Sequence, residues 1–187
     1  MLRSTILVTA LTTVLSLHAG AQAISTDSVA REQFKRRLAD QTDGWWLAPN
    51  ARYQAEDGGI EAYGLVFRLL PGGLGATGCL WGVRGGATLG PFWHFLSGWD
   101  PVSRRGFAYQ TAPSGAVGFG HSRELPDGQG EIVQAFEWPG RPAMRVRHLS
   151  RVVADTSFDR SFDEVDGRWV ARRSYDWVRQ RQGTPPC

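Results

Sequence analysis

The chain has 187 residues, and its 21 lysines and arginines stand against 18 acidic residues, so the formal net charge at pH 7 is only +3. Its basic residues are scattered rather than gathered in a run, which argues against a nucleic-acid-binding surface and against a membrane-surface patch. The length fits one domain that is large enough to enclose a core.

The N-terminus has the pattern of a secretory signal peptide. Arg3 is followed by an apolar run from Ile6 to Leu17 and then by Ala21-Gln22-Ala23, a small-residue cleavage site. A membrane-spanning helix needs roughly 20 apolar residues, which is longer than this run. The sequence therefore predicts a signal peptide over residues 1–23 and an exported protein, periplasmic or secreted, with no membrane span after cleavage. The alternative is an uncleaved anchor.

A short amphipathic helix is predicted in the segment 24–40. Asp27 or Ser28 can cap it, and Ala30, Phe34 and Leu38 recur at every fourth position. We expect this helix to close one end of the domain that follows.

Short apolar-alternating runs, separated by glycine, proline and aspartate turns, fill residues 41–180. This pattern is typical of an antiparallel barrel or sandwich, and glycines within the runs favour a strongly coiled barrel. The first candidate strand lies at Asp43–Leu47. The later candidates lie at Arg52–Glu56, Ile60–Leu70, Leu74–Arg84, Phe92–Trp99, Arg105–Ala112, Ala116–Glu124, Glu131–Trp138, Ala143–Val153, Ser157–Val165 and Arg168–Val178.

The last two of these strands form a hairpin whose pairing the turn should fix. A two-residue turn at Asp166-Gly167 pairs Val165 with Arg168. Counting outward from that pair sets Arg160 opposite Arg173, on the face that also carries most of the aromatic residues. We expect that face to be buried, so the two arginines need a compensating partner there.

Several of these features resemble the lipocalin and wider calycin superfamily. Gly44-Trp45-Trp46 has the form G-x-W on the first strand after a helix, and the last strand carries arginines. The stretches GWDPVSRRGFAYQTAPSGAVGFG and FDEVDGRWVARRSYDWVR look like a bacterial exported domain-of-unknown-function family of calycin-like proteins. The resemblance spans Leu38 to Arg179. It implies a cup-shaped, antiparallel up-and-down barrel of about 8–10 strands that binds small hydrophobic ligands inside. It also implies that Arg173 or Arg172 stacks on Trp46 or Trp45.

Two cysteines, Cys79 and Cys187, leave two interpretations open. An oxidising compartment would let them form a disulfide between a strand and the last residue. Alternatively Cys79 packs as a small apolar side chain, and Cys187 ends a flexible tail over residues 181–187.

Catalytic and metal-binding signals are weak. His94, His121 and His148 are each expected to face inward, but their spacing matches no ligand motif, so we predict no metal and no cofactor. The chain contains no nucleophile elbow or phosphate-binding loop that would identify an enzyme.

The sequence favours an exported small-molecule-binding barrel, with an aromatic-lined cavity for a hydrophobic or amphipathic molecule that has an acidic group as one option. Two alternatives stay open: a barrel isomerase, cyclase or lyase using an inward histidine, tyrosine or carboxylate, and a non-catalytic structural or interaction module. The residues expected to contact the ligand are Trp81, Trp93, Tyr109, Phe119, Phe136, His148, Arg160, Arg173, Tyr175 and Trp177.

Overall fold

A computed structural model describes residues 28–187 of the chain as one helix, at residues 28–42, followed by ten β-strands. The predicted signal peptide and the first residues of the predicted helical segment lie outside the described residues. The strands are β1 (Trp45–Pro49), β2 (Ala62–Leu69), β3 (Gly75–Arg84), β4 (Ala87–Asp100), β5 (Arg105–Thr111), β6 (Val117–Glu124), β7 (Gly130–Trp138), β8 (Arg141–Val153), β9 (Thr156–Val165) and β10 (Arg168–Gln180).

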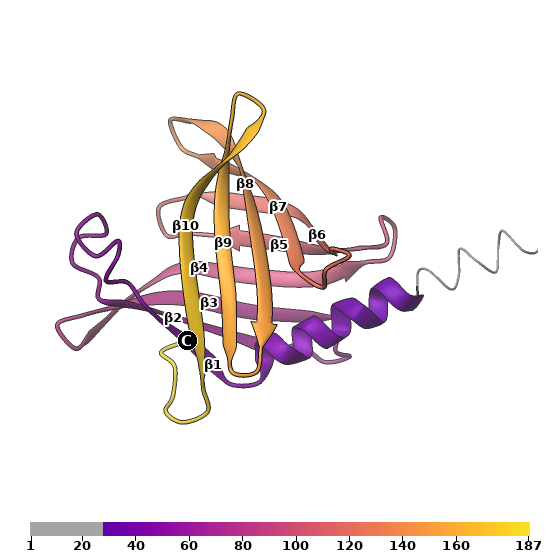
Figure 1. Ribbon diagram of the computed structural model, residues 1–187, viewed down its shortest axis with the longest axis horizontal. Helices are drawn as coiled ribbons and strands as arrows, with labels where there is room; N and C mark the ends of the chain where they lie inside the picture. The colour runs from indigo at the N-terminus through magenta and orange to yellow at the C-terminus, as the bar shows by residue number, and fades with distance from the viewer. Residues whose placement is uncertain (1–27) are drawn as a thin grey trace, which may run out of the picture.

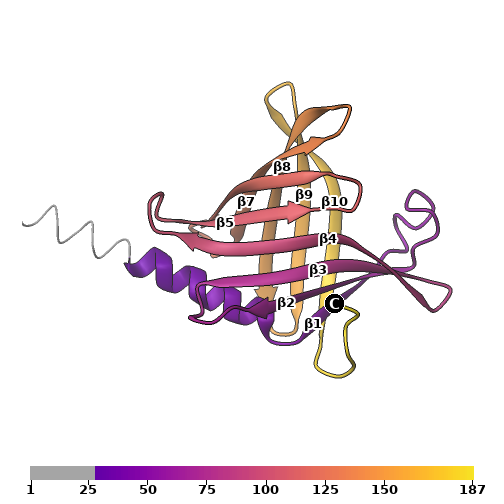
Figure 2. The ribbon, with the colours of Figure 1, turned by 180° about the vertical axis from the view of Figure 1, so that it is seen from behind.

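The ten strands form a closed antiparallel barrel. Each strand pairs with its neighbour in the sequence, and β1 pairs with β10 to complete the ring. Figures 1 and 2 show β8, β9 and β10 crossing β3, β4 and β5 at a steep angle, so that the two groups of strands form opposite walls. The predicted all-β, up-and-down barrel with one short N-terminal helix is therefore confirmed, and its architecture is consistent with a calycin-like fold.

One predicted strand is wrong. Arg52–Glu56 lies in a run of turns between β1 and β2. Gly58 and Gly59 both have positive φ, 65° and 85°, which interrupts an extended chain. Within the segment, the backbone N–H of Tyr53 donates to the carbonyl of Asn50 at 3.0 Å, a local turn bond in place of a sheet ladder. We call residues 50–61 the β1–β2 cap.

The N-terminal helix closes one end of the barrel, as its apolar face predicts. Phe34 and Leu38 are almost fully buried and pack against Ala76, with Phe67 and Trp99 alongside. The β1–β2 cap projects on the side of the barrel away from the helix's N-terminal end (Figures 1 and 2).

The G-x-W tryptophan does meet a last-strand arginine, but a different one from those expected. Trp46 is 2% exposed, and the guanidinium carbon of Arg179 lies 4.3 Å from its ring centre. Arg179 also donates from Nη1 to the carbonyl oxygens of Asp40 and Asp43, at 2.8 and 2.6 Å. This arginine therefore ties the end of the helix to β1 and β10, which leaves the preceding arginines of β10 for other contacts.

The β9–β10 hairpin starts in the predicted register and then departs from it. Asp166 and Gly167 both have positive φ, 50° and 73°, as a two-residue hairpin turn requires, and Val165 pairs with Arg168. A bulge between Ala171 and Arg173 then inserts one extra residue. From the bulge onward Arg173 pairs with Ser161 instead of Arg160, so the two predicted faces are exchanged on β10 relative to β9.

The C-terminal segment lies against the outside of the barrel. Cys187 and Cys79 form a disulfide with a Cα–Cα distance of 6.4 Å across 108 residues of sequence. Cys79 belongs to an outward-facing cluster with Val66 and Trp81, and Trp45 packs against this cluster. Of the two interpretations of the cysteines, the structure thus has the disulfide, which holds the last residue of the chain against β3.

Candidate functional site

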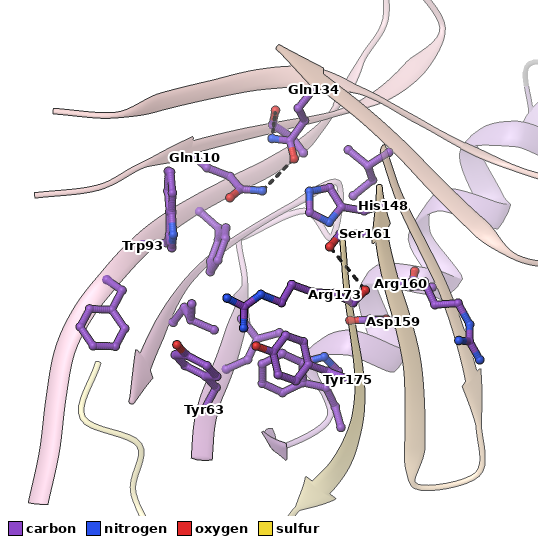
Figure 3. Close-up of a pocket in the computed structure, with 18 of the residues that line it drawn as sticks. Tyr63, Trp93, Gln110, Gln134, His148, Asp159, Arg160, Ser161, Arg173 and Tyr175 are labelled. Carbon is purple, nitrogen blue, oxygen red and sulfur yellow. Dashed lines mark hydrogen bonds between the residues drawn. The ribbon is translucent and has the colours of Figure 1, made fainter. Parts of the chain in front are cut away.

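The barrel encloses a cavity of about 600 Å³, with an apolar wall and a polar wall. Figure 3 shows the side chains of both walls converging on one space. The apolar wall comes from β2, β3 and β4 and consists of Tyr63, Leu65, Phe67, Leu80, Phe92, Trp93 and Phe95. The polar wall comes from β5 and from β7 to β10 and includes Gln110, Gln134, His148, Ser150, Asp159, Ser161 and Arg173.

Arg173 extends into the cavity, but its charge is already neutralised. Its Nη1 and Nη2 donate to the two carboxylate oxygens of Asp57 in the β1–β2 cap, at 3.1 and 2.9 Å. Glu56 adds a longer ion pair at 3.3 Å, and the guanidinium carbon lies 4.3 Å from the ring centre of Tyr53. Such a bidentate arginine–carboxylate contact has a fixed geometry, so Arg173 anchors the cap to β10.

Further hydrogen bonds complete this network around Asp57. The Tyr63 hydroxyl donates to Asp57 Oδ2 at 2.9 Å, and Asn50 Nδ2 donates to the same oxygen at 3.0 Å. The Tyr175 hydroxyl donates to Asn50 Oδ1 at 3.1 Å. Burial, together with the Asp57 carboxylate, raises the pKa of the Tyr63 hydroxyl well above its ordinary value. Because each polar group has a partner, this end of the cavity is structurally complete without a ligand.

Two glutamines line the middle of the polar wall. Gln110 Nε2 donates to Gln134 Oε1 at 2.8 Å, and Gln134 is fully buried. Gln134 pairs with Gly120 in the sheet, and a Cβ at Gly120 would collide with the backbone of Val133 and Gln134. A glycine is therefore required where β6 and β7 approach closely beside the glutamines.

Asp159 is a half-buried carboxyl group that faces the cavity without a cationic partner among the residues the structure describes. Its Oδ1 accepts a hydrogen bond from the Ser157 hydroxyl at 3.1 Å, and Tyr175 stands directly opposite it on β10. Burial raises the pKa of Asp159 to about 7, although Ser157 and Trp177 act in the opposite direction. Near neutral pH this carboxyl group is therefore poised between its neutral and anionic forms.

His148 lies on the neighbouring strand β8, opposite Ser161. Its Nε2 is buried, and no group in the described part of the chain makes a hydrogen bond to it. Burial lowers the pKa of this imidazole to about 4, and the nearby Arg172 acts in the same direction. His148 is thus neutral at pH 7.

All five predicted ligand contacts that lie on β4, β8 and β10 face the cavity. Trp93, His148, Arg173, Tyr175 and Trp177 all line it. Phe136 is buried behind Trp93, with their ring centres 5.5 Å apart, so it supports the wall.

Four predicted contacts are directed elsewhere. Trp81 packs in the outward cluster with Cys79, in the space left by the missing side chain of Gly64. Phe119 is 49% exposed and stacks on Phe107 outside the barrel. Tyr109 and Arg160 border the cavity.

Their side chains nevertheless lie on outward positions. Tyr109 is 37% exposed and pairs with the outward Phe119. Figure 3 shows the guanidinium of Arg160 directed away from the cavity. His94 is likewise exposed, and His121 packs against Phe119. The expectation of three inward histidines is wrong except at His148, because alternation along each strand places these positions outside.

The cavity also contains functional groups that the sequence analysis missed. The sequence analysis predicts no role for Asp57. Because the sequence predicts that Arg160 faces inward, it predicts that the neighbouring Asp159 faces outward; the bulge in β10 reverses this. The only signal for Asp159 was the alternating polar row of Ser157, Asp159 and Ser161 beside an apolar one.

In residues 28–187 no group of three or more histidine, cysteine, aspartate and glutamate side chains is placed to hold a metal ion. The same residues include no helix with the length and apolar character needed to cross a membrane. No known protein-family model and no curated protein matches this chain.

Proposed function

We propose that this protein is an exported β-barrel that binds a small amphipathic molecule inside its cavity. The observation that carries the proposal is the cavity of about 600 Å³, which has an aromatic wall facing a polar one. Ligand pockets of proteins have volumes of about 300–1,000 Å³ and combine apolar linings with a few polar groups. A structural barrel would instead fill its interior with side chains.

The two walls also suggest how a ligand would be oriented. An apolar or aromatic body would pack against Phe92, Trp93 and Phe95, while polar atoms would face His148 and Asp159. Neither arginine that suggested an acidic ligand offers a free charge to the cavity. Arg160 is directed away from it, and Arg173 is held by Asp57.

Export is part of the proposal and has two supports. The N-terminal sequence has the order of a signal peptide. The Cys79–Cys187 disulfide is a bond that persists mainly in oxidising compartments. N-terminal sequencing of the protein recovered from its host should begin at Ile24; a chain beginning at Met1 would contradict cleavage.

Binding is tested with N-phenyl-1-naphthylamine, an uncharged aromatic probe whose fluorescence rises in apolar surroundings. We expect saturable binding to the wild-type protein and a loss of at least tenfold in affinity for Ser161→Phe. Ser161 lines the cavity, so the new ring would occupy the ligand's space.

The matched control is Arg160→Phe, which adds a ring at the adjacent residue on the opposite face of β9. This variant should bind the probe as the wild-type protein does. Equal binding by the wild-type protein and Ser161→Phe would place the probe outside the cavity and contradict the proposal.

A second candidate function, acid–base catalysis in the same cavity, is favoured by one observation. Asp159 has a pKa of about 7 in a ligand-sized cavity, which suits a group that both donates and accepts protons. Incubating the protein with a ligand recovered from its host compartment distinguishes the two functions. Release of a chemically altered product indicates catalysis, and unaltered release indicates binding alone.

A further inference from the structure

We infer that the cavity selects an organic cation, an amphipathic amine whose ammonium group pairs with the carboxylate of Asp159 while its apolar body packs against the aromatic wall. The inference rests on the proposed binding function and adds the chemical class of the ligand.

The surroundings of Asp159 are those of an ammonium site. Its side chain lies on the inward face of β9 and borders the cavity. The Ser157 hydroxyl donates a hydrogen bond to it and the Trp177 indole lowers its pKa in the same way, but no arginine, lysine or histidine of the described residues pairs with it. Tyr175 stands opposite on β10, and Trp177 follows on the same face. Both aromatic side chains line the cavity, so the apolar part of an amine bound at Asp159 would contact them.

The other groups packed around Asp159 do not supply that cation. On β8, Ser150 is directly opposite, and His148, the next inward residue, is neutral at pH 7. On β10 the outward Asp176 is a further acidic group and raises the pKa of Asp159. The cation is therefore left for a ligand to provide.

The charges at the ends of the cavity do not reverse this preference. Arg173 is neutralised by Asp57, and Glu56 adds a further negative charge beside it. Arg172 lies 3.4 Å from Asp163 and is about half exposed. Of the charged side chains that line the cavity, Arg173 pairs with Asp57 and Arg172 pairs with Asp163, whereas Asp159 has no ion-pair partner among the described residues.

The test compares three ligands that share one body: 2-(2-naphthyl)ethylamine, 2-(2-naphthyl)ethanol and 2-naphthylacetate, by isothermal titration calorimetry at pH 8. We expect the amine to bind at least tenfold more tightly than the alcohol, and the carboxylate to bind most weakly. In Asp159→Asn the difference between amine and alcohol should fall to threefold or less, while the alcohol keeps its affinity.

Asp176→Asn is the matched control, because Asp176 is an exposed carboxylate on the outer face of β10, next to the Tyr175 that stands opposite Asp159. It should preserve the preference for the amine. A second measurement needs no variant. The ratio of amine to alcohol affinity in the wild-type protein should rise between pH 5.5 and 8, as Asp159 ionises while the amine stays protonated.

The outcomes separate this inference from the binding function on which it rests. Equal affinities for amine and alcohol, or a preference that survives in Asp159→Asn, overturn the cation inference and leave binding intact. If none of the three ligands binds, and N-phenyl-1-naphthylamine does not bind either, both proposals fail.

Discussion

Two charged regions of the cavity, one at the β1–β2 cap and one on the β8–β9 wall, differ in how their charges are balanced. At the cap, Arg173 and Asp57 satisfy each other through two hydrogen bonds, with Asn50 and Tyr63 on the remaining positions. On the wall, Asp159 has a serine hydroxyl as its partner. The nearby His148 has a buried nitrogen without a partner in the described residues.

The difference indicates which region maintains the fold and which is available to a ligand. Leaving a buried polar group without a partner costs about 1–3 kcal/mol, and more when the group is charged. The cap avoids that cost within the protein itself. The wall does not, which is expected where a ligand completes the contacts.

The largest expected effect is at the cap. Asp57→Asn removes the carboxylate and leaves Arg173 with only the exposed Glu56 as an ionic partner. Breaking a fully buried ion pair costs about 3–5 kcal/mol; because both partners here keep some exposure, we expect a loss of about 2–3 kcal/mol in the free energy of unfolding. Urea denaturation at pH 7 measures it.

Glu56→Gln is the control for this prediction. Glu56 is 69% exposed, and exposed ion pairs contribute about 0–1 kcal/mol, so this variant should stay close to the wild-type stability. Similar losses in both variants would contradict the distinction between the buried and exposed partners of Arg173.

Asp159→Asn should have a smaller effect, and one of opposite sign. Its pKa is about 7 in the folded protein and 3.8 ordinarily, so the folded state holds this proton more tightly than the unfolded state does. The stability of the wild-type protein therefore falls as the pH rises from about 4 to 7. Asparagine does not ionise, so the variant does not lose stability in this way. Its free energy of unfolding should exceed that of the wild type by about 1–2 kcal/mol at pH 8, but not at pH 4. Unfolding at both pH values tests this; lower stability of the variant at pH 8 would contradict it.

His148→Gln should show the smallest and reversed pH dependence. The folded pKa of about 4 lies below the ordinary 6.5, so the unfolded state takes up a proton first. His148 therefore makes the wild-type protein more stable as the pH rises from 4 to 6.5. When the pH is lowered from 7 to 4.5, the free energy of unfolding of His148→Gln should therefore rise by about 1 kcal/mol relative to that of the wild type. Thermal unfolding at the two pH values measures the change, and an unchanged difference would mean that His148 is not buried as a neutral ring.

Local turn chemistry explains why most of the fold was predictable. Asp166-Gly167 determines its own hairpin turn, and glycines or prolines lie in nearly every turn between consecutive strands. The β1–β2 cap was missed because Asn50 and Asp57 fold it through side-chain contacts with Tyr175 and Arg173 on the distant strand β10.

The cavity was harder to predict than the fold, for two physical reasons. The bulge before Arg173 shifts the register, and nothing near it in the sequence marks it. Aromatic residues also occupy both faces of the sheet: Phe119 stacks on Phe107 outside, whereas Trp93 faces inside. An aromatic residue therefore does not by itself indicate the cavity.

The most direct test of the central claim is the ionisation of Asp159, followed by carbon-13 NMR of its side-chain carboxyl group with and without 2-(2-naphthyl)ethylamine. The account predicts a pKa of about 7 in the free protein and a clear decrease when the amine is bound, because the ammonium group stabilises the carboxylate. A pKa near the ordinary value in the free protein, or one that the amine leaves unchanged, would contradict it.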